Sequence, residues 1–324
     1  EMVESKEFRE SNCKIPLPLG KDIAGNIVMR TFEEMPHLLI AGSTGSGKTA
    51  IMDSVITSTL FKSTPAEVQM ILVDPRMSSF GNYYDLPHLR EPIITDIKKT
   101  VEMLERMVGK LDLETGKVNG EMQKRLNMLG NAGVRNIDEF NRQVAQSGQG
   151  DYMPKILIVI DELADLMAVE GEKVERALVQ LAQMGRAVGI HLMIGTQRPS
   201  VDVVTGLIKA NFPARVGFRV ATRVDSRTIL DSMGAESLLG KGDMLFLPPG
   251  SARMIRCQGA FVSDYEIQKV VDSWKSALPR TAPFSTPPPA PTTTPVKKPK
   301  SEREERIDML DRQYTADNPD YVTP

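Results

Sequence analysis

Short apolar runs alternate with amphipathic segments along most of the chain. Five runs are almost wholly apolar, which is typical of strands buried on both faces of a sheet. Residues 50–60, 97–113 and 174–188 place apolar residues at helical spacing. This alternation predicts an α/β fold with a mostly parallel central sheet flanked by helices. The predicted strands are residues 37–41, 68–73, 155–160, 190–195 and 214–220.

Outside these elements the pattern is weaker. Residues 111–131 favour a helix without a clear period, residues 143–152 resemble a polar loop, and residues 242–250 indicate a late hairpin. From about residue 279, proline, threonine and lysine dominate, and this composition cannot build a core. The predicted division is a linker or the end of a preceding element at residues 1–18, one domain at residues 19–278 and a disordered tail at residues 279–324.

The segment between the first predicted strand and the first helix carries the strongest chemical signal. Residues 42–49, GSTGSGKT, match the Walker A pattern G-x-x-x-x-G-K-[ST] at every fixed position. Its glycines let the backbone wrap around phosphates, and amides at the helix start face the anion. Lys48 is expected to reach the β- and γ-phosphates, and the Thr49 hydroxyl to bind Mg²⁺. A plain glycine-rich turn is the alternative, which the four fixed positions disfavour. We predict an ATP site formed by Gly42, Ser43, Thr44, Gly45, Ser46, Gly47, Lys48, Thr49 and Ala50.

Another predicted strand, residues 155–160, is followed directly by the two carboxylates Asp161 and Glu162. Carboxyl ends of parallel strands meet at one edge of a sheet, so this pair is expected beside the glycine-rich loop. Asp161 is predicted to hold Mg²⁺, and Glu162 to polarise the water that attacks the γ-phosphate. Such a strand end is common by chance, and its pairing with residues 42–49 gives it weight.

Two further polar residues are candidates for catalysis. Gln197 follows the strand at residues 190–195, where it can contact the γ-phosphate as a sensor or act as an ordinary strand-end cap. Arg186 lies near the end of the helix at residues 174–188. It can reach across a subunit boundary to a neighbour's ATP, or it can be a cation favoured at a helix C-terminus.

Composition limits the remaining function classes. The 324 residues are 41% hydrophobic and 25% charged, as in ordinary globular proteins, and the net charge of -2 gives no global sign of nucleic-acid binding. Residues 186–256 hold ten basic and five acidic side chains, which suits a phosphate-backbone surface or a solvated face. Three histidines and two distant cysteines disfavour a zinc site, and no apolar run approaches the roughly 18 residues that span a bilayer.

Longer stretches extend these motifs. They include MPHLLIAGSTGSGKT at residues 35–49, VIDELADLM at residues 159–167 and GTQRPSVDVVTGLIKAN at residues 195–211. Together with DSRTILD at residues 225–231 they resemble the motor domain of the FtsK/SpoIIIE family of bacterial DNA translocases. The similarity extends over roughly residues 15–275, and motifs of this length are specific. Arg76 is a departure, because lysine is usual at its position in the family.

The resemblance implies a RecA-like P-loop ATPase whose homo-hexameric ring surrounds double-stranded DNA, with ATP and Mg²⁺ at the subunit interfaces. It favours Arg186 as the residue that acts on a neighbour's ATP. It also implies that Arg198, Arg223 and Arg227 contact the DNA backbone without reading sequence. The implied role is chromosome segregation at division or sporulation. Full-length members are expected at the cytoplasmic side of the inner membrane, held there by regions absent from this soluble piece.

Three other function classes are open to comparison. A related ring ATPase that moves protein, in type VII secretion or conjugative coupling, is disfavoured by the stretch at residues 196–211. A small-molecule P-loop kinase would need a lid and an acceptor site, which the sequence does not offer. A non-catalytic ring scaffold is disfavoured by the intact Lys48, Asp161 and Glu162.

Overall fold

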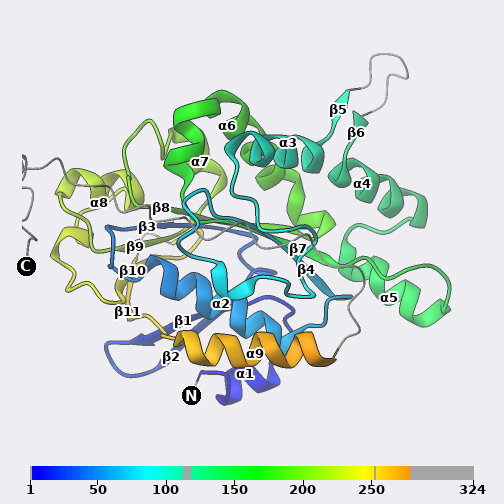
Figure 1. The fold of residues 1–324 in the computed structure, drawn as a ribbon, viewed down its shortest axis with the longest axis horizontal. Coiled ribbons are helices and arrows are strands. Elements are labelled where there is room, and N and C mark those ends of the chain that lie inside the picture. Colours follow the sequence, from blue (N-terminus) through cyan, green and yellow to red (C-terminus); the bar gives the residue numbers. More distant parts are fainter. Residues whose placement is uncertain (1, 112–117, 252, 278–324) are drawn as a thin grey trace, which may run out of the picture. The chain divides into compact units, whose positions relative to one another are not determined.

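A nine-stranded sheet forms the centre of the computed structural model, which describes residues 2–111, 118–251 and 253–277 (Figure 1). The strand order is β2-β1-β11-β10-β9-β3-β8-β7-β4. The five strands from β9 to β4 are parallel neighbours, which confirms the predicted parallel core. The strands are β1 (Pro16–Asp22), β2 (Ile27–Thr31), β3 (His37–Ala41), β4 (Val68–Val73), β7 (Lys155–Ile160), β8 (Ile190–Thr196), β9 (Ala214–Phe218), β10 (Asp243–Leu247) and β11 (Ile255–Gln258).

The other half of the sheet is antiparallel, so the sheet is mixed and the prediction of a mostly parallel sheet was too broad. Within the described residues, four pairings in this sheet are parallel and four are antiparallel. β10 and β11 form the predicted late hairpin, and β1 and β2 form a hairpin at the edge. The sequence pattern missed this edge hairpin because Pro16 and Pro18 interrupt it, and proline is uncommon inside strands.

Helices cover both faces of the sheet, and each face has its own hydrophobic core (Figure 1). α2 and α9 pack on one face, where they bury Val55 and Val271. α3, α4, α6 and α7 pack on the other face, where they bury Leu104 and Leu178. The helices are α1 (Lys6–Glu10), α2 (Lys48–Lys62), α3 (Ile97–Val108), α4 (Glu121–Ala132), α5 (Ile137–Ser147), α6 (Leu163–Val188), α7 (Gly206–Asn211), α8 (Arg223–Leu230) and α9 (Asp264–Ala277); β5 (Lys110–Leu111) and β6 (Val118–Asn119) form a small separate sheet.

Helices lie where the pattern predicted them, but several begin or end at other residues than predicted. α3 stops at Val108, five residues early, because Gly109 adopts a φ of 105°. α6 starts well before residue 174 and contains a kink at Glu170. α5 continues to Ser147, so the first half of the predicted loop at residues 143–152 is helical.

The structure describes the predicted domain boundary at residue 18 but not the predicted tail. β1 begins at Pro16 and buries Leu17 completely, so the sheet includes residues that the predicted boundary at residue 18 leaves outside. The predicted tail at residues 279–324 lies outside the described residues. The division into a preceding element, a motor domain and a tail therefore stays a prediction.

Candidate functional site

The glycine-rich loop, residues 42–49, joins β3 to α2 at the carboxyl edge of the parallel strands. β3 is fully buried between β9 and β8, and the Gly42 amide donates to the Thr196 carbonyl at the end of β8 (3.2 Å). Gly47 has a φ of 123°, and a Cβ there would lie 2.8 Å from the backbone of Gly242. Both the backbone angle and the space therefore require glycine at this position.

A cavity of about 460 Å³ lies against this loop. Seven of the nine residues predicted to bind ATP line it, and Gly42 and Ser46 belong to the loop without lining the cavity. Gln197 and Phe218 line it from the neighbouring strands. The seven loop residues are Ser43, Thr44, Gly45, Gly47, Lys48, Thr49 and Ala50.

Lys48 and Asp161 form a buried ion pair beside the cavity. Lys48 Nζ donates to Asp161 Oδ1 (2.5 Å) and to the Asp161 carbonyl (2.6 Å), and both side chains are almost fully buried. Asp161 Oδ2 and the Ser46 hydroxyl have no hydrogen-bond partner among the described residues. Unsatisfied buried oxygens are unusual, and Mg²⁺ prefers oxygen ligands. The free Asp161 oxygen fits a Mg²⁺ ion that also binds phosphates, and Thr49, which lines the cavity, carries a hydroxyl that can serve as a second ligand.

The Glu162 side chain is fully buried and held in one position by hydrogen bonds. Its Oε1 accepts from the Thr196 hydroxyl (2.7 Å), and its Oε2 accepts from the Gln197 amide (3.0 Å). It also caps α6 by accepting from the Ala164 amide (3.2 Å). A carboxylate fixed at the sheet edge in this way can orient a water molecule or accept a proton.

Gln197 joins the loop to the carboxylates, as its predicted position beside Glu162 requires. Its side-chain oxygen Oε1 accepts from the Thr44 hydroxyl of the loop (2.9 Å). The same oxygen accepts from Nη1 of Arg76 (3.3 Å). Gln197 is thus in contact with both the loop and the Glu162 side of the site.

Arg76 and Asp165 belong to this site, and sequence reasoning missed both. Arg76 follows the end of β4, and Asp165 lies in the first turn of α6. Arg76 Nε donates to Asp165 Oδ2 (2.7 Å), and the pair holds the pKa of Asp165 below its usual value. Arg198, a predicted DNA contact, also donates to Asp165 (2.7 Å). The available signals were weak: Asp165 lies one helical turn after Glu162, and Arg76 replaces the lysine usual at its position in the family.

A second missed part of the cavity comes from the antiparallel half of the sheet. Gly242 donates its amide to the Ser46 carbonyl (2.8 Å) and accepts from the Gly259 amide (2.7 Å). The side chain of Gln258 donates to the Lys241 carbonyl (2.9 Å) and lines the cavity with Phe261. No motif marks these residues as ligand contacts, because they reach the loop only after the chain has folded.

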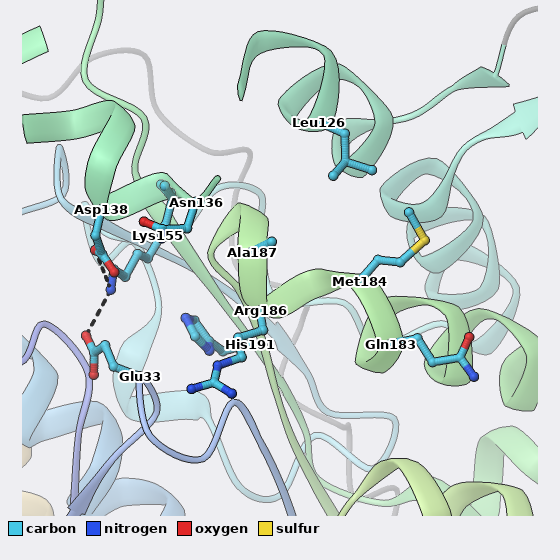
Figure 2. A pocket seen from close by; sticks show the side chains of 11 residues that line it. Glu33, Leu126, Asn136, Asp138, Lys155, Gln183, Met184, Arg186, Ala187 and His191 are labelled. Carbon is cyan, nitrogen blue, oxygen red and sulfur yellow. Dashed lines mark hydrogen bonds and ion pairs between the residues drawn. The ribbon is translucent and has the colours of Figure 1, made fainter. Parts of the chain in front are cut away.

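Arg186 lies apart from these residues, at the amino edge of the parallel strands. It lies two residues before the end of α6, and β8 then runs from Ile190 towards Gln197 at the other edge. Figure 2 shows Arg186 next to His191 in a separate cavity of about 580 Å³. Lys155 in this cavity pairs with Glu33 and Asp138, and burial followed by the charge of Lys155 lowers the pKa of His191 to about 3. The structure therefore separates Arg186 from the chain's own Lys48.

The last two predicted DNA contacts, Arg223 and Arg227, lie on α8 and do not line the nucleotide cavity. α8 follows β9 at the carboxyl edge, and Thr222 starts it with a capping box that Asp225 completes. The side chain of Arg223 is 77% exposed and lies 3.7 Å from Glu236. Arg227 is exposed as well. The helix presents two cations one turn apart.

Residues 1–201 match the model of the FtsK/SpoIIIE family. The chain belongs to the FtsK/SpoIIIE family. The DNA translocase SftA of Bacillus subtilis (strain 168) is 47% identical over 281 residues, and the DNA translocase FtsK of Caldanaerobacter subterraneus subsp. tengcongensis is 48% identical over 275 residues. These alignments cover 87% and 85% of this chain but 28% and 37% of the relatives. The matched part of this chain therefore spans about a third of the length of these relatives.

Solved structures with the same fold include ATPases of other systems. The pCW3 conjugation coupling protein TcpA, in a monomer form with ATPγS, is 28% identical with a TM-score of 0.67, over 81% of this chain and 71% of TcpA. The cytoplasmic domain of the type VII secretion ATPase EccC from Thermomonospora curvata has a TM-score of 0.70 at 22% identity, over 85% of this chain and 32% of EccC. Among the described helices of this family member, none combines the length and apolar character needed to cross a bilayer.

Proposed function

We propose that this chain is a RecA-like motor domain that hydrolyses ATP and uses the energy to move double-stranded DNA through a homo-hexameric ring. The observation that carries the proposal is the joint position of the Lys48–Asp161 pair, Glu162 and Gln197 at one sheet edge, beside a cavity lined by a complete Walker A loop. The family relatives named DNA translocases support DNA as the substrate.

ATP and Mg²⁺ fit the residues of this edge. The loop amides and Lys48 would hold the phosphates, and the Thr49 hydroxyl with Asp161 would hold the metal. When bound, Mg²⁺ neutralises phosphate charge and favours attack by water. Glu162 would orient that water and accept its proton, while Gln197 would report the state of the γ-phosphate to the loop through Thr44.

The position of Arg186 supports catalysis shared between subunits. Because it lies at the sheet edge opposite its own Lys48, it cannot serve the ATP site of its own chain. A ring would bring it to a neighbour's site, where its positive charge would stabilise the transition state. The alternative is that Arg186 is only a cation favoured near the end of α6. In that case its removal changes turnover only through the stability of the protein.

Arg198, Arg223 and Arg227 would supply the DNA contacts. All three follow strands that end at the carboxyl edge, and α8 presents two of them to solvent. Arginines that bind phosphates give sequence-independent binding that weakens with salt. Chromosome segregation at division or sporulation is the role this activity would serve. The membrane would be reached only through other regions of a longer protein.

The test is steady-state ATP turnover by the purified chain with and without linear duplex DNA. We expect strong stimulation by DNA of any sequence, weaker stimulation as salt rises, and loss of turnover in Glu162→Gln. Turnover that is indifferent to DNA in particles sized as rings would contradict the proposal. That result would favour the alternative of a related ring ATPase that moves protein, in type VII secretion or conjugative coupling.

A further inference from the structure

The carboxylate of Asp165 is shared by two arginines from different parts of the chain. Oδ1 accepts from Arg198 Nη2 (2.7 Å) and from Arg76 Nη2 (3.0 Å), and Oδ2 accepts from Arg76 Nε (2.7 Å). Arg198 is the most exposed of the three, with 61% of its side chain accessible, whereas Asp165 is 19% accessible. A group that draws Arg198 into solvent would therefore leave Oδ1 to Arg76 alone.

Arg76 reaches from Asp165 to the reaction residues. Its Nη1 lies 3.3 Å from Gln197 Oε1 and 3.6 Å from Glu162 Oε2. Glu162 is fully buried, so its charge is poorly screened by water, and Arg76 is the cation that pairs with it among the described residues. An unbroken line of charged contacts thus runs from the exposed Arg198 to the buried Glu162.

The geometry points to a coupling role for this line: Arg76 restrains Glu162, and Asp165 relays the loss of Arg198 to DNA so that Arg76 is drawn away from Glu162. This inference rests on the proposed function. In the arrangement seen, Asp165 Oδ1 divides its hydrogen bonds between two guanidinium groups. A DNA phosphate that takes Arg198 strengthens the remaining pair with Arg76, because one acceptor then serves one donor group. Glu162 then loses its contact with the Arg76 guanidinium and is free to orient the attacking water.

Arg76 and Asp165 are positioning residues in this scheme, and their variants should differ in sign. In Arg76→Ala no cation restrains Glu162, although its hydrogen bonds to Thr196 and Gln197 remain. We therefore expect turnover without DNA to rise about two- to fivefold, the range supported by an ion pair of a part-exposed arginine. Turnover with saturating DNA should change little, and the stimulation ratio should fall by the same factor. In Asp165→Asn, Glu162 is the remaining carboxylate for Arg76, so turnover without DNA should not rise and DNA should stimulate weakly.

The experiment measures turnover with and without duplex DNA for wild type, Arg76→Ala, Asp165→Asn and the double variant. The double variant should behave like Arg76→Ala, since Asp165 acts only through Arg76. Arg76→Lys should restore part of the ratio because it keeps the charge but not the fork. Arg106→Ala is the matched control, because Arg106 is also an exposed arginine that pairs with a carboxylate, Glu91 (2.6 Å), and neither residue lines the nucleotide cavity.

Two results would overturn the inference. If Arg76→Ala lowers turnover with DNA and turnover without DNA by the same factor, the stimulation ratio stays constant. Arg76 would then serve catalysis or stability alone. If the DNA-stimulation ratio falls in the double variant by the product of the two factors by which it falls in the single variants, no relay exists between the two residues. Wild-type turnover that ignores DNA would instead remove the proposed function, and the same series separates that outcome from the other two. Unfolding temperatures of the four proteins exclude loss of folding as the cause.

Discussion

Asp53 is the residue whose ionisation should be visible in the stability of the protein. It lies on α2, one turn beyond Thr49, and accepts a hydrogen bond from the Tyr83 hydroxyl (2.9 Å). Burial raises its pKa from 3.8 to about 7, the Tyr83 hydrogen bond opposes this shift, and the nearby charges of Asp264 and Asp161 add to it. The folded protein therefore keeps a proton on this carboxyl at a pH where the unfolded chain has lost it.

The sign of the resulting pH dependence follows from this difference. Between about pH 4 and pH 7 the unfolded chain binds fewer protons, so the contribution of Asp53 to stability falls as pH rises, and it levels off above about pH 7. Asp53→Asn cannot ionise and keeps an oxygen for Tyr83. Its free energy of unfolding should exceed that of wild type by an amount that grows with pH, to on the order of 2 kcal/mol at pH 8. Urea denaturation at several pH values measures this.

A companion variant checks the cause of that profile. Tyr83→Phe removes the hydrogen bond that favours the charged carboxylate, so the falling window should extend above pH 7. A difference between Asp53→Asn and wild type that is independent of pH would show that Asp53 does not titrate in this range. The measurement needs no nucleotide or DNA and depends only on burial of this carboxyl.

At the scale of elements, α8 should govern affinity for DNA and leave the chemistry intact. It carries Arg223 and Arg227 away from the nucleotide cavity. Arg223→Ala and Arg227→Ala should each raise the DNA concentration that half-stimulates turnover. Each should also reduce the slope of log affinity against log salt by about one, the amount expected for one lost phosphate contact. Turnover without DNA should stay at the wild-type value.

The control for α8 is an exposed cation on the other face of the sheet. Lys6 on α1 is 79% accessible and pairs only loosely with Glu10 (3.9 Å). Lys6→Ala should leave both the half-stimulating DNA concentration and the salt slope unchanged. Equal effects of Lys6→Ala and Arg223→Ala would mean that the chain attracts DNA by its overall charge, and α8 would lose its special role.

The elements also differ in how far the sequence predicted them. The central strands were found because each contains a short continuous apolar run, such as residues 156–160. The edge strand β1 was not found, because prolines break its pattern and its pairing with β11 joins residues more than 200 positions apart in the chain. Motifs predicted the loop, Asp161 and Glu162 in the same way, since each is local. Arg76 and Gln258 were missed because only tertiary contacts make them part of the site.

At the scale of the whole molecule, the decisive question is whether one chain completes the site of another. Glu162→Gln should abolish turnover. Arg186→Ala should lower turnover by about a thousandfold if Arg186 supplies a transition-state charge. A ring mixed from equal amounts of the two variants contains interfaces where an intact Glu162 meets a neighbour's intact Arg186. Random assortment places that combination at about a quarter of the interfaces, so mixing should restore turnover to about that fraction of wild type.

The matched mixture combines Arg186→Ala with a chain that carries both substitutions, and it has no complete interface. It should stay inactive at every ratio. If the first mixture also stays inactive while cross-linking shows mixed particles, Arg186 does not act between subunits and its place near the end of α6 is structural. Recovery in the first mixture alone requires that one chain's carboxyl-edge site be completed by the amino-edge arginine of the next, because no single chain in that mixture holds both residues.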